Sequence, residues 1–294
     1  MGVVESELRP PVRRPTAPVR RRRMLGLAMR HTTLLFLAIV FLAPLVFILL
    51  TAVMTDNQVL SSHLWPSPFR WSNFADVFRR IPFARFTWNT LQIAALTTVG
   101  TLVSCIPVAY ALSHLRWRGR GAALLVILAT YMLPIQATII PMYVLFAKLH
   151  WIGSFKPLIV PSFFGDAFAI FLLRQFFLTV PTSLADAARI EGASEFSVMT
   201  RVVVPLAKPA IAAVALFNFL YAWNDYFLPL LYIGEKRELW TLSLGLADFR
   251  TLHQVQWNLT LAASLMFMVP AIAVFIAAQR VVVRGVALRP GPER

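Results

Sequence analysis

The 294-residue chain is poor in cysteine, in charged residues and especially in acids. Its single cysteine, Cys105, excludes an intramolecular disulfide, a CxxC redox pair and a cysteine-rich zinc site. Only 14% of the residues are charged, whereas a soluble domain has about 25%. Because 58% of the residues are hydrophobic and the mean hydropathy is +0.68, the composition indicates a polytopic membrane protein.

The motifs of common catalytic chains are also missing. No glycine is followed by lysine, so the chain has no P-loop, and it has no GxSxG nucleophile elbow. The histidines are scattered, without an HExxH pair or an acid at ligand spacing. We therefore expect no catalytic residue, no metal and no cofactor in this chain. The driving force must come from an ion gradient or from another subunit.

Six apolar runs are long enough to cross a bilayer. Four of them carry no charge, and two carry one acid each, Asp166 and Asp225. The runs are His31–Thr55, Phe86–Ser113, Gly121–Ala147, Pro157–Leu173, Pro209–Gly234 and Trp257–Gln279. Since an open sheet leaves backbone groups unpaired in lipid, the predicted fold class is all-α with six transmembrane helices.

The basic residues predict the orientation. If the N-terminus is cytoplasmic, about two thirds of the 28 Lys and Arg fall on the inner side, which favours cytoplasmic N- and C-termini. The net charge of +15 then reflects topology and contact with membrane lipid, so we expect no nucleic acid partner. The predicted organisation is a disordered basic tail over residues 1–30, a transmembrane domain over 31–284 and a short cytoplasmic tail over 285–294.

One long inner loop, residues 179–208, has an organised pattern. Pro181 followed by Ser183 and Asp186 has the spacing of a capping box and predicts the start of a helix. Gly192 is suited to end that helix in a left-handed conformation, and Ser194 is suited to cap a second helix. The loop is therefore expected to form a short helix–turn–helix on the cytoplasmic surface.

This loop resembles the EAA loop of ATP-binding-cassette importer permeases, in which Glu-Ala-Ala, a glycine and Leu-Pro recur at set spacing. Asp186–Ala188 and Gly192 match, with Asp in place of Glu, and Val204-Pro205 matches with Val in place of Leu. In that family the loop docks on an ATPase. The residues that the resemblance assigns to this contact are Asp186, Ala187, Ala188, Glu191, Gly192, Ala193, Phe196 and Pro205.

The resemblance extends to maltose-type carbohydrate permeases over most of the chain. Its further matches are Pro134–Gln136, Phe171–Phe177, Trp223–Asp225, Trp65–Phe69 and Trp71–Phe74. It implies the MetI-like permease fold in the bacterial cytoplasmic (inner) membrane. It also implies a second permease subunit, two ATPase subunits that hold ATP and Mg, and an extracytoplasmic sugar-binding protein.

The fifth run contains the strongest candidates for contact with solute. Trp223 is predicted just beyond the middle of the membrane, where an indole beside Asn224 and Asp225 suits a polyhydroxylated ligand. The alternative is that these polar groups hold the helix against its partner permease. The candidate residues of the solute pathway are Asn218, Tyr221, Trp223, Asn224, Asp225 and Gln136, with Asp166 as a weaker one.

Two other functions stay open from the sequence. An ATP-driven permease for an amino acid or peptide shares the same loop, although the Trp223–Asp225 element favours sugar. An ion-coupled secondary transporter would use Asp166 and Asp225 as proton or cation sites. A membrane-embedded enzyme is disfavoured, because no acid–base or nucleophile arrangement is visible.

Overall fold

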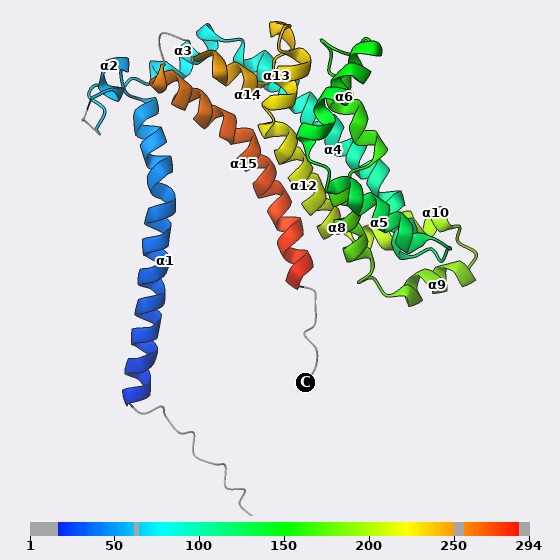
Figure 1. Cartoon of the computed structure of the whole chain (residues 1–294). Helices are drawn as coiled ribbons and strands as arrows, with labels where there is room; N and C mark the ends of the chain where they lie inside the picture. Colours follow the sequence, from blue (N-terminus) through cyan, green and yellow to red (C-terminus); the bar gives the residue numbers. More distant parts are fainter. Residues whose placement is uncertain (1–16, 62–64, 250–255, 288–294) are drawn as a thin grey trace, which may run out of the picture. The chain divides into compact units, whose positions relative to one another are not determined.

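The computed structural model describes residues 17–61, 65–249 and 256–287 (Figure 1). Every regular element in these ranges is helical, which confirms the predicted all-α class. The longer helices are α1 (Ala17–Ala52), α3 (Ser72–Arg80), α4 (Phe83–Ser113), α5 (Arg120–Tyr131), α6 (Ile135–Lys148), α8 (Ala167–Phe177), α9 (Thr182–Ile190), α12 (Lys208–Asn224) and α15 (Trp257–Ala287). The short ones are α2 (Asp56–Val59), α7 (Lys156–Ile159), η1 (Val160–Phe164), α10 (Glu195–Val198), η2 (Met199–Val203), α11 (Val204–Leu206), α13 (Phe227–Ile233), η3 (Arg237–Leu239), α14 (Leu242–Leu246) and η4 (Ala247–Phe249).

The chain divides into two compact units between Leu50 and Thr51. In the first unit the described residues form most of α1, whose apolar stretch from Gly26 has no buried side. A helix that is apolar all round is typical of a membrane span. Residues 1–16 of the predicted tail 1–30 lie outside the described residues. Its remainder, from Ala17 onward, is helical as the first part of α1.

By length and composition, four stretches of the described ranges can each cross a membrane as one span. They are Gly26–Ala52, Phe83–Ser113, Lys156–Phe177 and Trp257–Val281. Two further pairs, Arg120–Tyr131 with Ile135–Lys148 and Glu195–Leu206 with Lys208–Asn224, are bent by 91° and 81°. The count reaches the predicted six when each bent pair is counted once. In the second pair only Lys208–Asn224 overlaps the predicted run Pro209–Gly234, since Glu195–Leu206 belongs to the 179–208 segment.

Three predicted runs are interrupted in the structure. The run Pro157–Leu173 is interrupted at Gly165 and Asp166, which are non-helical between η1 and α8. The run Gly121–Ala147 is not one straight helix, because Pro134 disfavours helical geometry in the residue before it and donates no backbone hydrogen bond. In the run Pro209–Gly234 the helix α12 ends at Asn224. Asp225 is extended there, and its Oδ1 accepts a hydrogen bond from Leu228 N at 3.2 Å, which starts α13 as a new helix.

The core of the second unit is built around α4, which packs against α8 and α12, while α12 packs against α15 (Figure 1). The largest buried cluster joins α4, α8 and the 179–208 segment through Leu112, Leu173, Phe177 and Val198. A Cβ at Gly100 would lie 2.3 Å from Ser162 Oγ, so η1 approaches the α4 backbone directly. The 179–208 segment is therefore fixed to α4 by shared apolar contacts.

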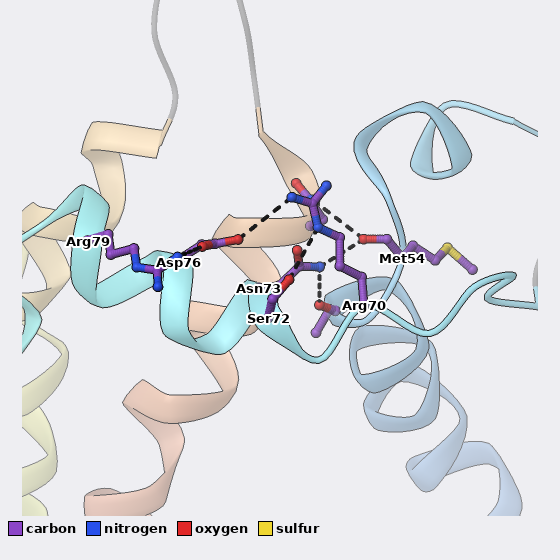
Figure 2. Close-up of polar contacts among 8 residues, drawn as sticks. Met54, Arg70, Ser72, Asn73, Asp76 and Arg79 are labelled. Atoms are coloured by element: carbon purple, nitrogen blue, oxygen red, sulfur yellow. Dashed lines mark hydrogen bonds and ion pairs between the residues drawn. The ribbon is translucent and has the colours of Figure 1, made fainter.

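Near the N-terminal end of α4, a network of hydrogen bonds and ion pairs holds the start of the second unit (Figure 2). The buried Asn73 side chain donates from Nδ2 to Ala52 O and Met54 O, both at 2.8 Å. Asp76 pairs with Arg79 at 3.1 Å and with Arg70 at 3.8 Å. These bonds tie α3 to the chain that enters this unit, and the sequence patterns did not predict them.

Candidate functional site

The first helix of the 179–208 segment is α9. It begins at Thr182 after Pro181, and no side chain caps it, so the predicted capping box at Ser183 and Asp186 is wrong. The Asp186 carboxylate instead accepts a hydrogen bond from Arg189 Nη1 at 2.7 Å, one helical turn further on. The acid therefore serves an ion pair on the helix surface rather than the helix start.

Gly192 ends α9 as predicted, with a φ of +85°. Gly192 N donates to Arg189 O and Ala193 N to Ala188 O, both at 3.0 Å, which satisfies the last carbonyls of the helix. A Cβ at Gly192 would meet no atom within 4 Å, so only the backbone conformation restricts this position. Ser194 caps α10 by accepting from Ser197 N at 3.3 Å, which confirms the second predicted helix start.

Glu195 joins this segment to α4. One carboxylate oxygen accepts from Arg189 Nε at 2.8 Å, and the other accepts from Arg189 Nη2 at 3.1 Å and from the Tyr110 hydroxyl at 2.5 Å. We call Tyr110, Asp186, Arg189 and Glu195 the α4 clasp. The Asp186–Arg189 spacing is readable from the sequence, whereas the bond between Tyr110 and Glu195 joins residues 85 positions apart and has no sequence signal.

The hydrogen bonds of the clasp keep Glu195 and Arg189 ionised. Hydrogen bonds from Arg189, and then from Tyr110, hold the pKa of Glu195 below its ordinary value, and Glu195 in turn raises the pKa of Arg189. Beside them, burial lowers the pKa of His114, whose ring stacks on Tyr110 with centroids 5.3 Å apart. The ring is therefore neutral near pH 7, with Nδ1 2.9 Å from Ser113 Oγ.

The surface around the clasp mixes polar and apolar groups. A hollow of about 800 Å³ is lined by His114, Leu115, Arg116, Trp117, Asp186, Arg189 and Glu195. Two large apolar side chains on either side of Gly192 in the sequence are exposed: Ile190 is 88% exposed and Phe196 is 72% exposed. Of the residues predicted to contact an ATPase, Ala188 and Ala193 are half-buried, and the exposed ones are Asp186, Ala187, Glu191, Gly192, Phe196 and Pro205. The segment thus presents large apolar side chains that no described residue covers.

A second hollow, of about 370 Å³, lies between α5, α8 and α12, and we call it the aromatic cavity. It is lined by Tyr131, Asp166, Phe168, Ala169, Val214, Phe217, Asn218 and Tyr221. Asn218 is held by α4, since its Nδ2 donates to Thr101 Oγ1 at 3.0 Å and its Oδ1 lies 3.4 Å from Thr98 Oγ1. The cavity brings together two of the predicted solute residues, Asn218 and Tyr221, with Asp166.

The other predicted solute residues lie outside the aromatic cavity. The Trp223 indole is 0% exposed and lies between Phe219 and Phe267, with centroids 5.6 and 5.5 Å away. It has no free face on which a sugar could stack in this conformation. Asn224 Nδ2 donates to Leu220 O at 2.7 Å, Asp225 caps α13, and Gln136 is exposed at the start of α6.

A family model described as "Binding-protein-dependent transport system inner membrane component" matches residues 97–288, which include the clasp and the aromatic cavity. The chain belongs to this family. It is thus a multi-pass permease component of a bacterial ABC importer, as the EAA-like loop predicted. Membership in this family does not support the ion-coupled alternative.

Curated relatives agree over almost the whole chain. The sn-glycerol-3-phosphate transport system permease protein UgpE of Yersinia enterocolitica is 31% identical over 268 residues, which is 87% of this chain and 94% of the relative. The arabinooligosaccharides transport system permease protein AraQ of Halalkalibacterium halodurans is 29% identical over 259 residues, with 86% and 92% covered. Both are permease subunits of the same length class as this chain.

Solved structures give the same fold. A chain of a bacterial ABC transporter that imports the acidic polysaccharide alginate superposes with a TM-score of 0.76 at 25% identity, covering 89% of this permease and 97% of that chain. A second alginate transporter structure, in complex with a pentasaccharide-bound periplasmic protein, gives a TM-score of 0.65 at 19% identity. A methionine ABC transporter in an inward-facing conformation gives 0.52 over 69% of the permease.

Proposed function

We propose that this permease subunit carries a sugar or oligosaccharide across the membrane, paired with a second permease and driven by separate ATPase subunits. In this proposal the 179–208 segment and both termini are cytoplasmic, and an extracytoplasmic binding protein delivers the solute. ATP and Mg belong to the ATPase partners, and this chain supplies no catalytic group.

The observation that carries the sugar assignment is the lining of the aromatic cavity. Tyr131 and Phe168 stack with centroids 6.1 Å apart, and Tyr221 adds a phenol hydroxyl. Asn218 is oriented by two threonines of α4, so its amide is prearranged. Apolar ring faces with a few fixed polar groups are what a polyhydroxylated ligand requires. Relatives named for arabinooligosaccharides and alginate support the same class.

The proposed contact with the ATPase centres on Ile190 and Phe196, two exposed apolar side chains that precede and follow Gly192 in the segment. Behind them the clasp fixes the segment to Tyr110 of α4. Tyr110 lies nine residues beyond Thr101, which is about 14 Å along the helix, and Thr101 holds Asn218 in the cavity. Movement of the segment can therefore reach the solute cavity through one helix.

The test is the affinity of the purified ATPase for the permease pair in proteoliposomes, with the double variant Ile190→Ala/Phe196→Ala. Burying each side chain fully is worth about 1.5–3 kcal/mol, so even partial burial predicts at least a tenfold loss of affinity, on the order of 1.4 kcal/mol. Leu60→Ala, at a residue that is 81% exposed and outside the segment, is the matched control and should change nothing.

Unchanged ATPase affinity in the double variant would contradict the proposed docking surface. The solute class is tested separately by identifying the ligand of the co-purifying binding protein. An amino acid or peptide in that binding protein would overturn the sugar assignment and leave the docking result intact.

A further inference from the structure

The aromatic cavity carries charge of only one sign. Asp166 is the one ionisable acid among its lining residues, and none of them is Lys, Arg or His. The field in this cavity is therefore set by the Asp166 carboxylate, without a compensating base in the wall.

The Asp166 carboxylate is fixed in place. Its Oδ1 accepts from Ala169 N at 2.6 Å, which caps the first turn of α8. The same acid offsets the positive end of that helix dipole, so the helix start does not serve as an anion site. Asn218 Nδ2 already donates one hydrogen bond to Thr101. Because its side-chain amide is uncharged, Asn218 adds no positive charge that could bind an anion.

These groups treat neutral and anionic solutes differently. A neutral polyol finds ring faces from Tyr131 and Phe168, a phenol hydroxyl from Tyr221 and the amide of Asn218. A phosphate or carboxylate in the same place meets Asp166 and no cation, and repulsion between like charges is stronger inside a protein than in water. This differs from what the names of two relatives indicate, since these are named for sn-glycerol-3-phosphate and for an acidic polysaccharide.

We propose that the aromatic cavity disfavours anions and admits neutral polyhydroxylated solutes, with Asp166 as the specificity-determining residue. The inference rests on the proposed function in one respect, which is that the transported solute passes through the aromatic cavity. The sign of the field in the cavity can be measured without knowing the solute.

The experiment uses thiol reagents of opposite charge and similar size on the complete transporter in proteoliposomes. Tyr221→Cys is placed in a Cys105→Ser background, and its modification rates by a cationic and an anionic methanethiosulfonate are normalised to a free thiol in solution. Phe217→Cys, on the same wall, is the second position in case Tyr221→Cys does not fold. Leu60→Cys, outside the cavity, serves as the control.

The cationic reagent should react faster at the cavity positions, and Asp166→Asn should reduce the cation-to-anion ratio by about tenfold. Asparagine keeps the cap of α8, so the variant removes charge with little change in shape. The ratio at Leu60→Cys should not change. An equal rate for the two reagents, a ratio that Asp166→Asn leaves unchanged, or no reaction at either cavity cysteine would overturn the proposal.

Uptake of the binding protein's solute by the same proteoliposomes tests the proposed function independently. A transported amino acid together with the expected charge ratio would overturn the sugar assignment alone. A transported neutral sugar with a ratio insensitive to Asp166→Asn would overturn the assigned role of Asp166 alone.

Discussion

Replacing Glu195 by glutamine should loosen the connection between the 179–208 segment and α4. The two carboxylate oxygens accept three hydrogen bonds, two from Arg189 and one from the Tyr110 hydroxyl. A glutamine of the same shape has one acceptor oxygen, and its NH2 group faces a donor at the other position. The variant therefore loses the charge and at least one of the bonds without creating a cavity.

The magnitude follows from the geometry and the exposure. A hydrogen bond to a charged group contributes about 1.5–3 kcal/mol when shielded. The side chain of Glu195 is 47% exposed and that of Arg189 is 29% exposed. Solvent screening therefore lowers the free energy that their ion pair contributes to about 0.5–1 kcal/mol. With about 1 kcal/mol for the Tyr110 bond, the total is on the order of 1–2 kcal/mol, or a 5- to 30-fold shift in local opening.

The assay is hydrogen–deuterium exchange of the backbone amides around α10, measured by mass spectrometry on the purified transporter. The amide of Val198, which bonds to Ser194 O at 2.9 Å, reports directly on this turn. Glu191→Gln is the matched control, because Glu191 is an exposed acid of the same segment whose side chain makes no hydrogen bond or ion pair within the described ranges. Only Glu195→Gln should accelerate exchange.

A double-mutant cycle with Tyr110→Phe isolates the bond that crosses between the segment and α4. The interaction energy should be about 1 kcal/mol. Exchange in Glu195→Gln no faster than in Glu191→Gln would refute the reasoning, since the clasp would then contribute nothing to holding the segment.

Three further predictions concern other positions. Gly192→Val should lose coupled uptake, because a φ of +85° costs a branched residue about 1–2 kcal/mol. Gly192→Asn should keep most of the uptake. Uptake assays in which both variants fail would show that docking needs a position without a side chain here. Trp223→Ala should leave a cavity costing about 3–5 kcal/mol, so uptake and stimulated ATP hydrolysis should fall together, and survival of hydrolysis alone would indicate a solute contact. Because burial lowers the pKa of His114, its contribution to stability is full above about pH 6.5 and is lost as the pH falls toward the lower folded-state pKa. The thermal midpoint should thus fall less on acidification in His114→Gln than in the parent protein.

The apolar runs and the turn at Gly192 could be predicted because each depends on local physics. Uninterrupted apolar length identifies a span, and a glycine after an alanine-rich helix marks its left-handed end. The breaks were harder to foresee. Pro134 lies inside a continuous apolar run, and the role of Asp225 as a helix cap depends on where the preceding helix stops.

The functional side chains were predicted less well, since their partners are distant in sequence. Tyr110 and Glu195 meet only because α4 and the 179–208 segment pack against a common core. The position of Trp223 in the sequence suits either a binding surface or a packed interior. Only the neighbouring rings of Phe219 and Phe267 reveal that the indole is enclosed. Asp186 illustrates the same limit, because a cap and an ion pair require the same residue type at nearly the same spacing.

The central claim is that ATP hydrolysis by partner subunits drives solute through this permease by way of the 179–208 segment. The direct measurement is solute uptake into proteoliposomes that hold the permease pair, the ATPase subunits and the loaded binding protein. Uptake should require ATP on the ATPase side, should continue when ionophores collapse the membrane potential and ion gradients, and should fall in Ile190→Ala/Phe196→Ala. Uptake that persists without ATP and stops when the gradients collapse would contradict the account.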